Sequence, residues 1–336
     1  MKTHSTESQT IREPKRISIV APAFNEERIL QQFYERVKNV LESTGYPFEL
    51  VIVENGSTDE SLEILKRIRK SDPRLHYISL TRNFGHQGAL IAGLENACGD
   101  VVILMDADLQ HPPELIPEML DHWKRHYDVV YTVKRDAKAQ PFLRRVLDRW
   151  FYGLMQKLSG IELYGQSDYR LMDRKAVEAL CALPERNKFL RGLTRWVGFH
   201  QIGVSYDVAP RPAGESKFRL SHLIKFAVDG IFSFSIIPLR LFVFIGIFIS
   251  LGSFVYGIYL VILQFYAVLT GSGENIFPSG WTTLIFVMLF LGGVQLIGIG
   301  LLGEYLGRVY DEVKGRPAYI IQQSSRVMDK QERKLI

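Results

Sequence analysis

The sequence has little cysteine and lacks the common nucleotide-binding signatures. Its two cysteines, Cys98 and Cys181, have neither CxxC spacing nor a histidine cluster beside them, so neither a disulfide framework nor a zinc site is indicated. This cysteine usage is typical of a reducing compartment. No Gly-x-Gly-x-x-Gly follows the first apolar run and no GxxxxGK(S/T) occurs anywhere, so a dinucleotide-binding fold and a P-loop are not supported.

A strong charge of one sign is also missing. The net charge is +5 at pH 7 for 336 residues, which gives no argument for a nucleic-acid partner. Residues 1–16 form a polar tail without the apolar core of a signal peptide. We therefore expect the N-terminal part of the chain to stay on the cytosolic side.

Charged residues are absent from two long stretches near the C-terminus. Neither Leu241–Gly273 nor Asn275–Gly303 contains one, and each stretch exceeds the roughly 20 residues that span a bilayer as a helix. A buried core helix gives one such run, but two in succession favour membrane spans, which we place within residues 239–306. Lysine and arginine are absent between Arg240 and Arg308 and present on both flanks, so both chain ends are expected in the cytosol.

Weaker patterns flank these spans. Residues 221–238 mix apolar side chains with His222, Lys225 and Asp229, which predicts a juxtamembrane amphipathic helix in the membrane interface, although an ordinary surface helix would look similar. Residues 307–336 predict one short cytosolic strand within GRPAYIIQQSS and then a charged tail. A lone strand needs a pairing partner.

Residues 17–220 alternate strand and helix patterns in the order β-α-β-α-β-α-β. This order predicts an α/β domain with a mostly parallel sheet, in which ligands bind beyond the carboxyl ends of the strands. Polar residues cluster after each of the four predicted strands. They are Asn25 and Glu26, then Glu54, Asn55 and Asp59, then Arg82 and Asn83, and finally Asp106 and Asp108.

The stretch ILMDADLQHPPE places Asp106 and Asp108 directly after an apolar strand. An unpaired buried carboxylate is very costly, so two of them one residue apart are expected to meet a cation. Oxygen ligands without His or Cys favour Mg2+ or Mn2+, which bind one or two carboxylates together with substrate phosphates. A diphosphate substrate is the natural partner, and a solvated turn with exposed acids is the alternative.

Five segments in this order resemble a known family. They are IVAPAFNEE, VIVENGSTDES, LTRNFGHQGAL, ILMDADLQHPPE and RPAGESKF, and two membrane spans follow them. Together they are similar to the family-2 glycosyltransferases that attach a sugar to polyprenyl phosphate, such as dolichol-phosphate mannose synthases and GtrB-type undecaprenyl-phosphate glucosyltransferases. The resemblance extends from Ile17 to about Gln322. It implies the GT-A nucleotide-sugar-binding fold.

The resemblance also implies site residues. The nucleotide-sugar contacts would be Pro22, Phe24, Glu26, Glu54, Asn55, Arg82 and Asp106, and the metal ligands Asp106, Asp108 and Gln110. Glu54 and Asn55 stand where the family more often has two aspartates, which puts the identity of the nucleotide base in doubt. Gln110 is alternatively a simple turn residue.

A lipid phosphate acceptor needs cations near the membrane. The candidates are Lys134, Arg135, Arg144, Arg170, Arg211 and Lys217. Arg211 and Lys217 match a family segment just before the predicted interfacial helix, so we group them with Asp106 and Asp108 as catalytic. Basic residues of this kind alternatively form a solvated face or bind anionic headgroups. Because a phosphate acceptor is already an anion, no general base is required, and His86 and His111 are given structural roles.

These observations lead to one prediction and two rivals. The chain is expected to transfer a hexose, with UDP-glucose as the favoured donor, to polyprenyl phosphate on the cytosolic membrane face, with inversion and with Mg2+ or Mn2+. The rivals are a transferase that acts on another lipid or glycan and a non-catalytic membrane scaffold that binds nucleotide sugars. By resemblance to the family, the C-terminal strand pairs with another protomer, so a homo-oligomer such as a tetramer is expected.

Overall fold

The computed structural model describes residues 12–134, 153, 166–186, 188–207, 236–270 and 281–326. The chain divides into two compact units, one holding Met1–Gln156, Ile161–Ile224 and Arg316–Ile336, the other Lys157–Gly160 and Lys225–Gly315. Several predictions fall outside the described residues. They concern Arg135, Arg144, Arg211, Lys217, most of the interfacial helix at 221–238 and the loop between the two spans.

The first unit is built on one eight-stranded sheet with the order β7-β5-β6-β4-β1-β2-β3-β8. The strands are β1 (Ile17–Ala23), β2 (Phe48–Glu54), β3 (Leu75–Leu80), β4 (Val101–Leu104), β5 (Val129–Lys134), β6 (Gln166–Asp173), β7 (Gln201–Tyr206) and β8 (Ile321–Ser324). β4, β1, β2 and β3 are parallel neighbours, which confirms the predicted mostly parallel sheet. β6 runs antiparallel between β4 and β5, a reversal that the sequence did not predict.

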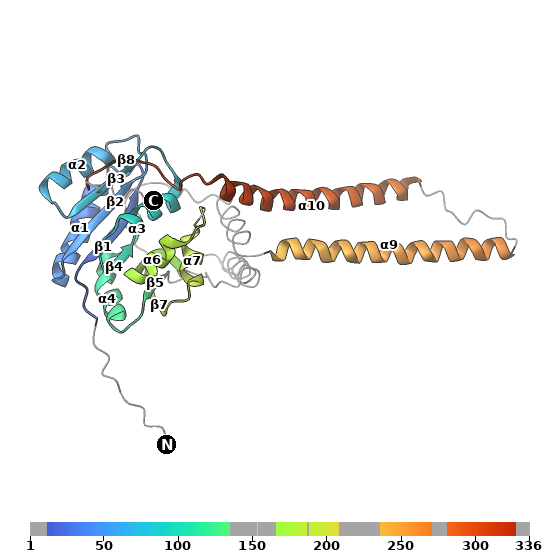
Figure 1. Ribbon diagram of the computed structural model, residues 1–336, viewed down its shortest axis with the longest axis horizontal. Coiled ribbons are helices and arrows are strands. Elements are labelled where there is room, and N and C mark those ends of the chain that lie inside the picture. Colours follow the sequence, from blue (N-terminus) through green and yellow to red (C-terminus); the bar gives the residue numbers. More distant parts are fainter. Residues whose placement is uncertain are drawn as a thin grey trace, which may run out of the picture. The chain divides into compact units, whose positions relative to one another are not determined.

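Helices cover both faces of this sheet (Figure 1). They are α1 (Leu30–Thr44), α2 (Ser61–Ser71), α3 (Gly85–Asn96), η1 (Pro113–Leu115), α4 (Ile116–Lys124), α6 (Arg174–Ala182) and α7 (Leu190–Trp196). α1 buries Leu30, Phe33, Val37 and Leu41, a helical spacing that turns one apolar stripe toward the sheet. The same core cluster takes in Ile17 and its alternate neighbours on β1.

The opposite face of β1 packs against α3. A Cβ atom on Gly93 of α3 would lie 2.2 Å from Val20 Cγ1, so the helix approaches the strand as closely as a glycine permits. Because both faces of the central strands are covered, β1 and β2 are almost entirely buried and mostly apolar, as parallel strands in α/β folds usually are.

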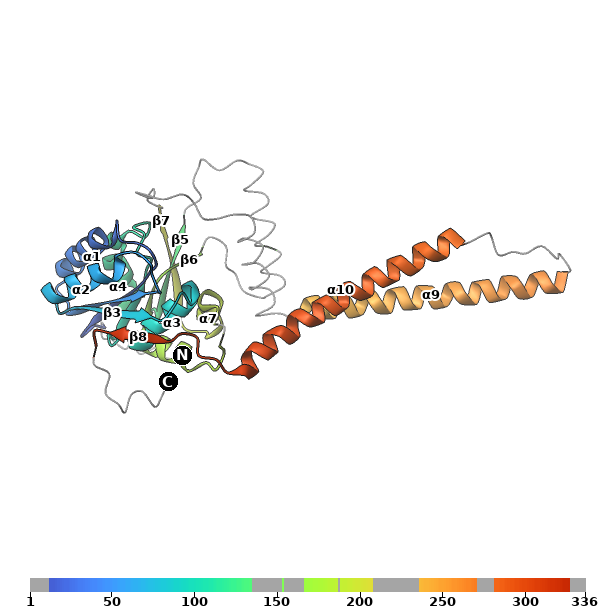
Figure 2. The same cartoon turned by 90° about the horizontal axis from the view of Figure 1, so that it is seen from above.

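The predicted C-terminal strand is present and has a partner within the same chain. β8 pairs antiparallel with β3 and becomes the edge of the sheet, as Figure 2 shows. Pairing of this strand with another protomer therefore stays a prediction.

The second unit contains two helices, α9 (Ile237–Thr270) and α10 (Trp281–Lys314), of 34 residues each. Both are long and apolar enough to cross a membrane, with candidate spans at Leu239–Tyr256 and Phe290–Lys314. At 1.5 Å per residue each helix is about 50 Å long, more than the roughly 30 Å of a bilayer core. The predicted end of the second span, residue 306, therefore falls inside a helix that continues to Lys314.

Candidate active site

The carboxyl ends of the central strands bring the predicted site residues to one edge of the sheet. Asp106 and Asp108 follow β4, and Arg82 follows β3. β6 adds residues to the same edge because it runs antiparallel: its Arg170 pairs with Leu104, so Asp168 lies beyond the end of β4. β5 runs parallel to β4 and ends at Lys134, which is exposed on this edge.

The loops after β1 and β2 are bonded to each other. Asn25 Oδ1 accepts from Thr58 N at 2.9 Å, and Ser61 Oγ accepts from Glu26 N at 3.0 Å. Pro22, Phe24 and Glu26, at the end of β1 and in the loop after it, are half-buried. The loop after β2 also meets the loop after β3: Gly56 has φ +69°, and a Cβ there would lie 2.4 Å from the backbone carbon of Arg82, so only glycine allows this approach.

Glu54 and Asn55 are buried and hold neighbouring loops. Glu54 is 2% exposed, and its carboxylate accepts from Ser57 N and from Ser79 Oγ, the latter at 2.6 Å. Asn55 Nδ2 donates to Asn83 Oδ1 at 3.2 Å and to Gly85 O at 3.1 Å, while its Oδ1 accepts from Phe84 N at 2.9 Å. These contacts give both side chains a structural role, and their predicted contact with the nucleotide stays a prediction.

Arg82 is exposed at the end of β3 and stacks over Phe84, with 4.1 Å between its guanidinium carbon and the ring centroid. Its Nη1 donates to Asn83 O at 3.1 Å. The side chain thus remains at the surface, where a nucleotide sugar can reach it.

Asp106 and Asp108 occupy a tight turn after β4. Asp108 Oδ1 accepts from Gln110 N at 3.1 Å, and Leu109 between them has φ 62°. The Asp106 side chain is 32% exposed and lies beside two imidazoles, with His86 Nε2 at 3.5 Å and His111 Nδ1 at 3.7 Å. The turn therefore presents half-exposed oxygen ligands of the predicted kind.

His111 supports this turn from beneath. Its Nδ1 accepts from Asp106 N at 2.9 Å, so Nε2 carries the proton and donates to Ser167 Oγ at 2.9 Å. Its ring stacks on Tyr169, with the centroids 5.1 Å apart. Burial lowers the pKa of His111 below its usual value, against the opposing charge of Asp106. A neutral, buried and fully bonded imidazole agrees with the structural role predicted for it.

Asp168 lies close to several basic side chains beside Asp106. Arg191 from α7 donates two hydrogen bonds to it, from Nε to Oδ1 at 3.2 Å and from Nη2 to Oδ2 at 2.7 Å. Arg170 Nη2 and His86 Nε2 follow at 3.6 and 3.7 Å. Burial alone would raise the pKa of Asp168, but the charges of Arg191 and His86 outweigh it and hold that pKa well below its usual range. His86 thus lies between two carboxylates, Asp106 in the turn after β4 and Asp168 on β6.

Arg170 is more deeply buried than we expect of a side chain that binds the acceptor phosphate, the role predicted for it. It is 1% exposed, donates from Nη2 to Ser167 O at 3.0 Å, and its Nε has no hydrogen-bond partner. Burial lowers the pKa of Arg170 to about 10. Its contact with an acceptor phosphate stays a prediction, whereas Lys134 is exposed at the sheet edge.

Asp106, Asp108 and Gln110 offer carboxylate and amide oxygens, the kind of ligand that a hard divalent cation prefers. Within the part of the chain that the structure describes, no three His, Cys, Asp or Glu side chains form a metal site. If two carboxylates and an amide held Mg2+, they would leave coordination positions for water and for substrate phosphates. Sequence reasoning did not single out Arg191, although the sequence shows an arginine at the start of this helical stretch.

Comparison with known proteins agrees with the fold and the motifs. Residues 18–181 match the family described as Glycosyl transferase family 2. The chain is 43% identical over 312 residues, 93% of its length and 99% of the relative's, to the SfII prophage-derived bactoprenol glucosyl transferase of Shigella flexneri. It is 41% identical over 314 residues, 93% of its length and 95% of the relative's, to the uncharacterized glycosyltransferase YkcC of Bacillus subtilis.

Among solved structures, one match is glucosyl-3-phosphoglycerate synthase from Mycobacterium tuberculosis, crystallised with Mn2+, UDP-glucose and phosphoglyceric acid. The match has a TM-score of 0.48 and 20% identity, and it covers 65% of this chain and 78% of that chain.

Proposed function

The chain belongs to glycosyl transferase family 2, and on this premise we propose that it transfers glucose from UDP-glucose to polyprenyl phosphate at the cytosolic face of a membrane. The name of the bactoprenol glucosyl transferase, a relative matched over 99% of its length, supports glucose as the transferred sugar and a polyprenyl acceptor, whereas UDP as the nucleotide of the donor is part of the proposal. In the molecule, the proposal depends on one observation, the half-exposed Asp106 and Asp108 at the carboxyl end of β4.

The proposed reaction exchanges one phosphate oxygen for another at the anomeric carbon. The bond from that carbon to the UDP oxygen breaks, and a bond to an oxygen of the lipid phosphate forms. Because the attacking phosphate is an anion at neutral pH, no side chain has to remove a proton. This agrees with the neutral, fully bonded His111. Direct displacement inverts the configuration of the sugar.

Asp106, Asp108 and Gln110 would hold the divalent cation. When bound, Mg2+ or Mn2+ supplies charge neutralisation for the leaving diphosphate. Arg82 would contact the donor from the end of β3, together with Pro22, Phe24 and Glu26 at the end of β1. Asp168 lies beside Asp106 in the same cluster and would face the sugar.

The acceptor would reach this edge from the membrane. Two helices long and apolar enough to span a bilayer follow the catalytic unit. Lys134 lies exposed at the sheet edge, and Arg135, Arg144, Arg211 and Lys217 would supply further cations for the lipid phosphate. We also propose that the chain forms a homo-oligomer, for which mass measurement in nanodiscs is the test; a monomer alone would contradict it.

The test uses the purified full chain in mild detergent with undecaprenyl phosphate, a panel of nucleotide sugars, and Mg2+ or Mn2+. UDP release and the mass of the extracted lipid are measured. We expect release with UDP-glucose that depends on lipid and metal, and a loss of at least about 100-fold for Asp108→Asn. The matched control is Asp121→Asn, which changes an exposed carboxylate on α4 and should retain full activity.

Other outcomes identify the rivals. Release of UDP without lipid dependence would indicate a different acceptor. Binding of UDP without turnover across the panel would indicate the scaffold. A product with retained anomeric configuration would contradict direct displacement.

A further inference from the structure

The segment that follows α10 runs along the catalytic unit from the site edge to the opposite edge. We call residues 318–326 the C-terminal strap. Ile320 O accepts from Thr81 N at 3.0 Å, immediately before Arg82, and Ile321 pairs with Leu80. Further along, Ser325 N donates to Tyr77 O at 3.0 Å. The strap therefore covers most of the length of β3, which would otherwise be the edge strand.

The strap also holds α3. A Cβ on Gly88, in the first turns of α3, would lie 3.1 Å from Ala318 O, so the two backbones touch. Tyr319 is 8% exposed, and its hydroxyl donates to Glu95 Oε2 at 2.5 Å near the end of α3. The strap thus contacts this helix near both of its ends.

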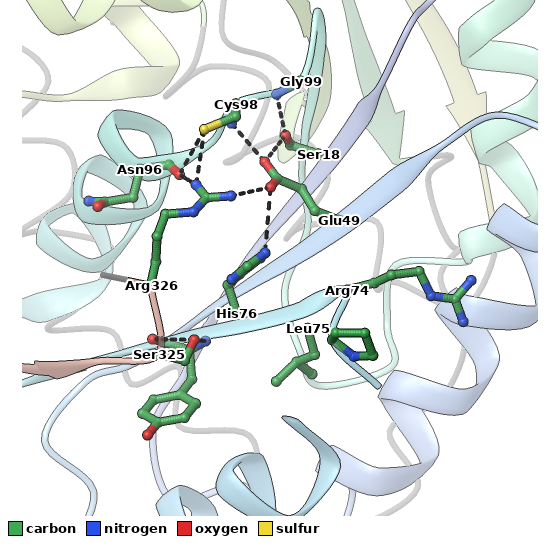
Figure 3. A network of polar contacts seen from close by, with 12 residues as sticks. Ser18, Glu49, Arg74, Leu75, His76, Asn96, Cys98, Gly99, Ser325 and Arg326 are labelled. Atoms are coloured by element: carbon green, nitrogen blue, oxygen red, sulfur yellow. Dashed lines mark hydrogen bonds and ion pairs between the residues drawn. The ribbon is translucent and has the colours of Figure 1, made fainter. Parts of the chain in front are cut away.

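Arg326 anchors the strap at the amino edge of the sheet, as Figure 3 shows. Its Nη2 donates to Glu49 Oε2 at 2.5 Å, and its Nη1 donates to Asn96 O at 2.5 Å and to Cys98 Sγ at 3.0 Å. Glu49 is 3% exposed and also accepts from Ser18 Oγ at 2.6 Å and Cys98 N at 2.7 Å. One guanidinium therefore ties the strap to β2, to the end of α3 and to the turn before β4.

The two elements held by the strap flank one loop of the candidate active site. β3 ends just before Arg82, and α3 begins at Gly85 with His86 in its first turn. His86 contacts Asp106 and Asp168 at 3.5 and 3.7 Å. Movement of β3 against α3 would therefore change the position of Arg82 relative to His86.

We propose that the C-terminal strap positions the nucleotide-sugar site: anchored by Tyr319 and Arg326, it fixes β3 against α3 and so holds Arg82, in the loop between them, and His86, in the first turn of α3. This inference rests on the proposed function for the identity of the donor. Arg326 and Tyr319 are positioning residues, because they act on the donor through this loop.

The test compares full-chain variants in mild detergent by hydrogen exchange without substrate. Arg326→Ala should speed exchange in peptides containing Thr81 and residues 82–88 by roughly 10-fold or more, because charge-assisted bonds to a buried carboxylate are lost. The matched control is Arg74→Ala. Arg74 also pairs with a buried aspartate at this edge, Asp72 at 2.7 Å, but its contacts lie on Asp72, Glu42 and Phe48.

Kinetics separate positioning from general stability. For Arg326→Ala we expect the KM for UDP-glucose to rise about 5-fold or more with kcat within about 2-fold, and Arg326→Lys, which keeps the charge toward Glu49, to recover part of the loss. Tyr319→Phe should give a smaller change in the same direction. Exchange no faster than in Arg74→Ala, or faster exchange with an unchanged KM, would overturn the proposal.

The two proposals fail separately. If the wild-type chain transfers nothing from UDP-glucose, the proposed function is wrong, yet hydrogen exchange and the Kd for UDP still decide the role of the strap. If transfer occurs and Arg326→Ala changes neither exchange nor KM, only the strap proposal is wrong.

Discussion

Replacing Arg191 by alanine tests the ion cluster beside Asp106. In the wild type, Arg191 and Asp168 form a two-bond pair whose side chains are 18% and 15% exposed. Arg36 and Glu114 form a pair of the same geometry, with two bonds of 2.8 Å, but their side chains are 37% and 54% exposed. The two pairs differ mainly in burial, so their comparison isolates its effect.

The two substitutions are expected to differ several-fold in the loss of unfolding free energy. Removing one partner of a buried pair costs about 3–5 kcal/mol, and since Asp168 keeps Arg170 and His86 nearby, we expect a loss of about 2–3 kcal/mol for Arg191→Ala. An exposed pair contributes about 0–1 kcal/mol, which is the expected loss for Arg36→Ala. For a unit of this size, these losses correspond to Tm decreases of about 4–12 °C and at most about 4 °C.

Both Tm decreases are measured by thermal denaturation of the full chain in one detergent, with near-ultraviolet circular dichroism as the signal. Because the pKa of Asp168 is held below its usual range, its stabilisation is present above the unfolded value of about 3.9 and is lost as the pH falls below it. The difference between variant and wild type should therefore be constant from pH 8 to about 5. Asp168→Asn in the Arg191→Ala background should recover part of the loss. Equal Tm values for Arg191→Ala and Arg36→Ala would refute the reasoning.

Three further substitutions, two of them with a matched control substitution, test the loops and the amino edge. Burial and the charge of Arg326 lower the pKa of His76 from 6.5 to about 4. As the pH falls between these two values, the unfolded chain binds a proton at His76 before the folded chain does, so the free energy of unfolding decreases. His76→Phe should therefore flatten this decrease between about pH 6.5 and 4.5. Gly56→Ala should cost more than about 3 kcal/mol in chemical denaturation, but Gly45→Ala, with φ 74° and open space, about 1 kcal/mol. Asn55→Asp should lower the Tm by about 5 °C or more, since a carboxylate would face two acceptors, and Asn25→Asp, which keeps the acceptor for Thr58 N, by less than about 3 °C. Equal costs within either matched pair, or an unchanged pH profile for His76→Phe, would contradict these assignments.

Much of the fold could be predicted because its determinants are local. Apolar runs alternate with amphipathic stretches, and this alternation implies parallel strands with polar residues at their carboxyl ends. Asp106, Asp108 and Arg82 accordingly lie at one sheet edge. The length of the charge-free stretches likewise predicted two long apolar helices, which α9 and α10 confirm.

Long-range pairing could not be predicted in the same way. The partner of β8 lies more than 240 positions away along the chain, and the pairing of Ser325 with Tyr77 leaves no periodic pattern in either segment. The antiparallel direction of β6 brings Asp168 close to Asp106, and this pairing depends on strand register and not on composition. Arg191 acquires its role only through that reversal.

Asn55 shows where a sequence pattern reaches its limit. The family pattern marks this position as a departure, since an aspartate is often found there, and the sequence alone leaves the identity of the nucleotide base in doubt. In the structure the side chain is bonded to a neighbouring loop, because Nδ2 donates to Asn83 Oδ1 and Gly85 O while Oδ1 accepts from Phe84 N. An amide, unlike a carboxylate, can donate and accept at once. The asparagine is therefore explained by the loop to which it is bonded, and that loop leads directly into the first turn of α3, which carries His86.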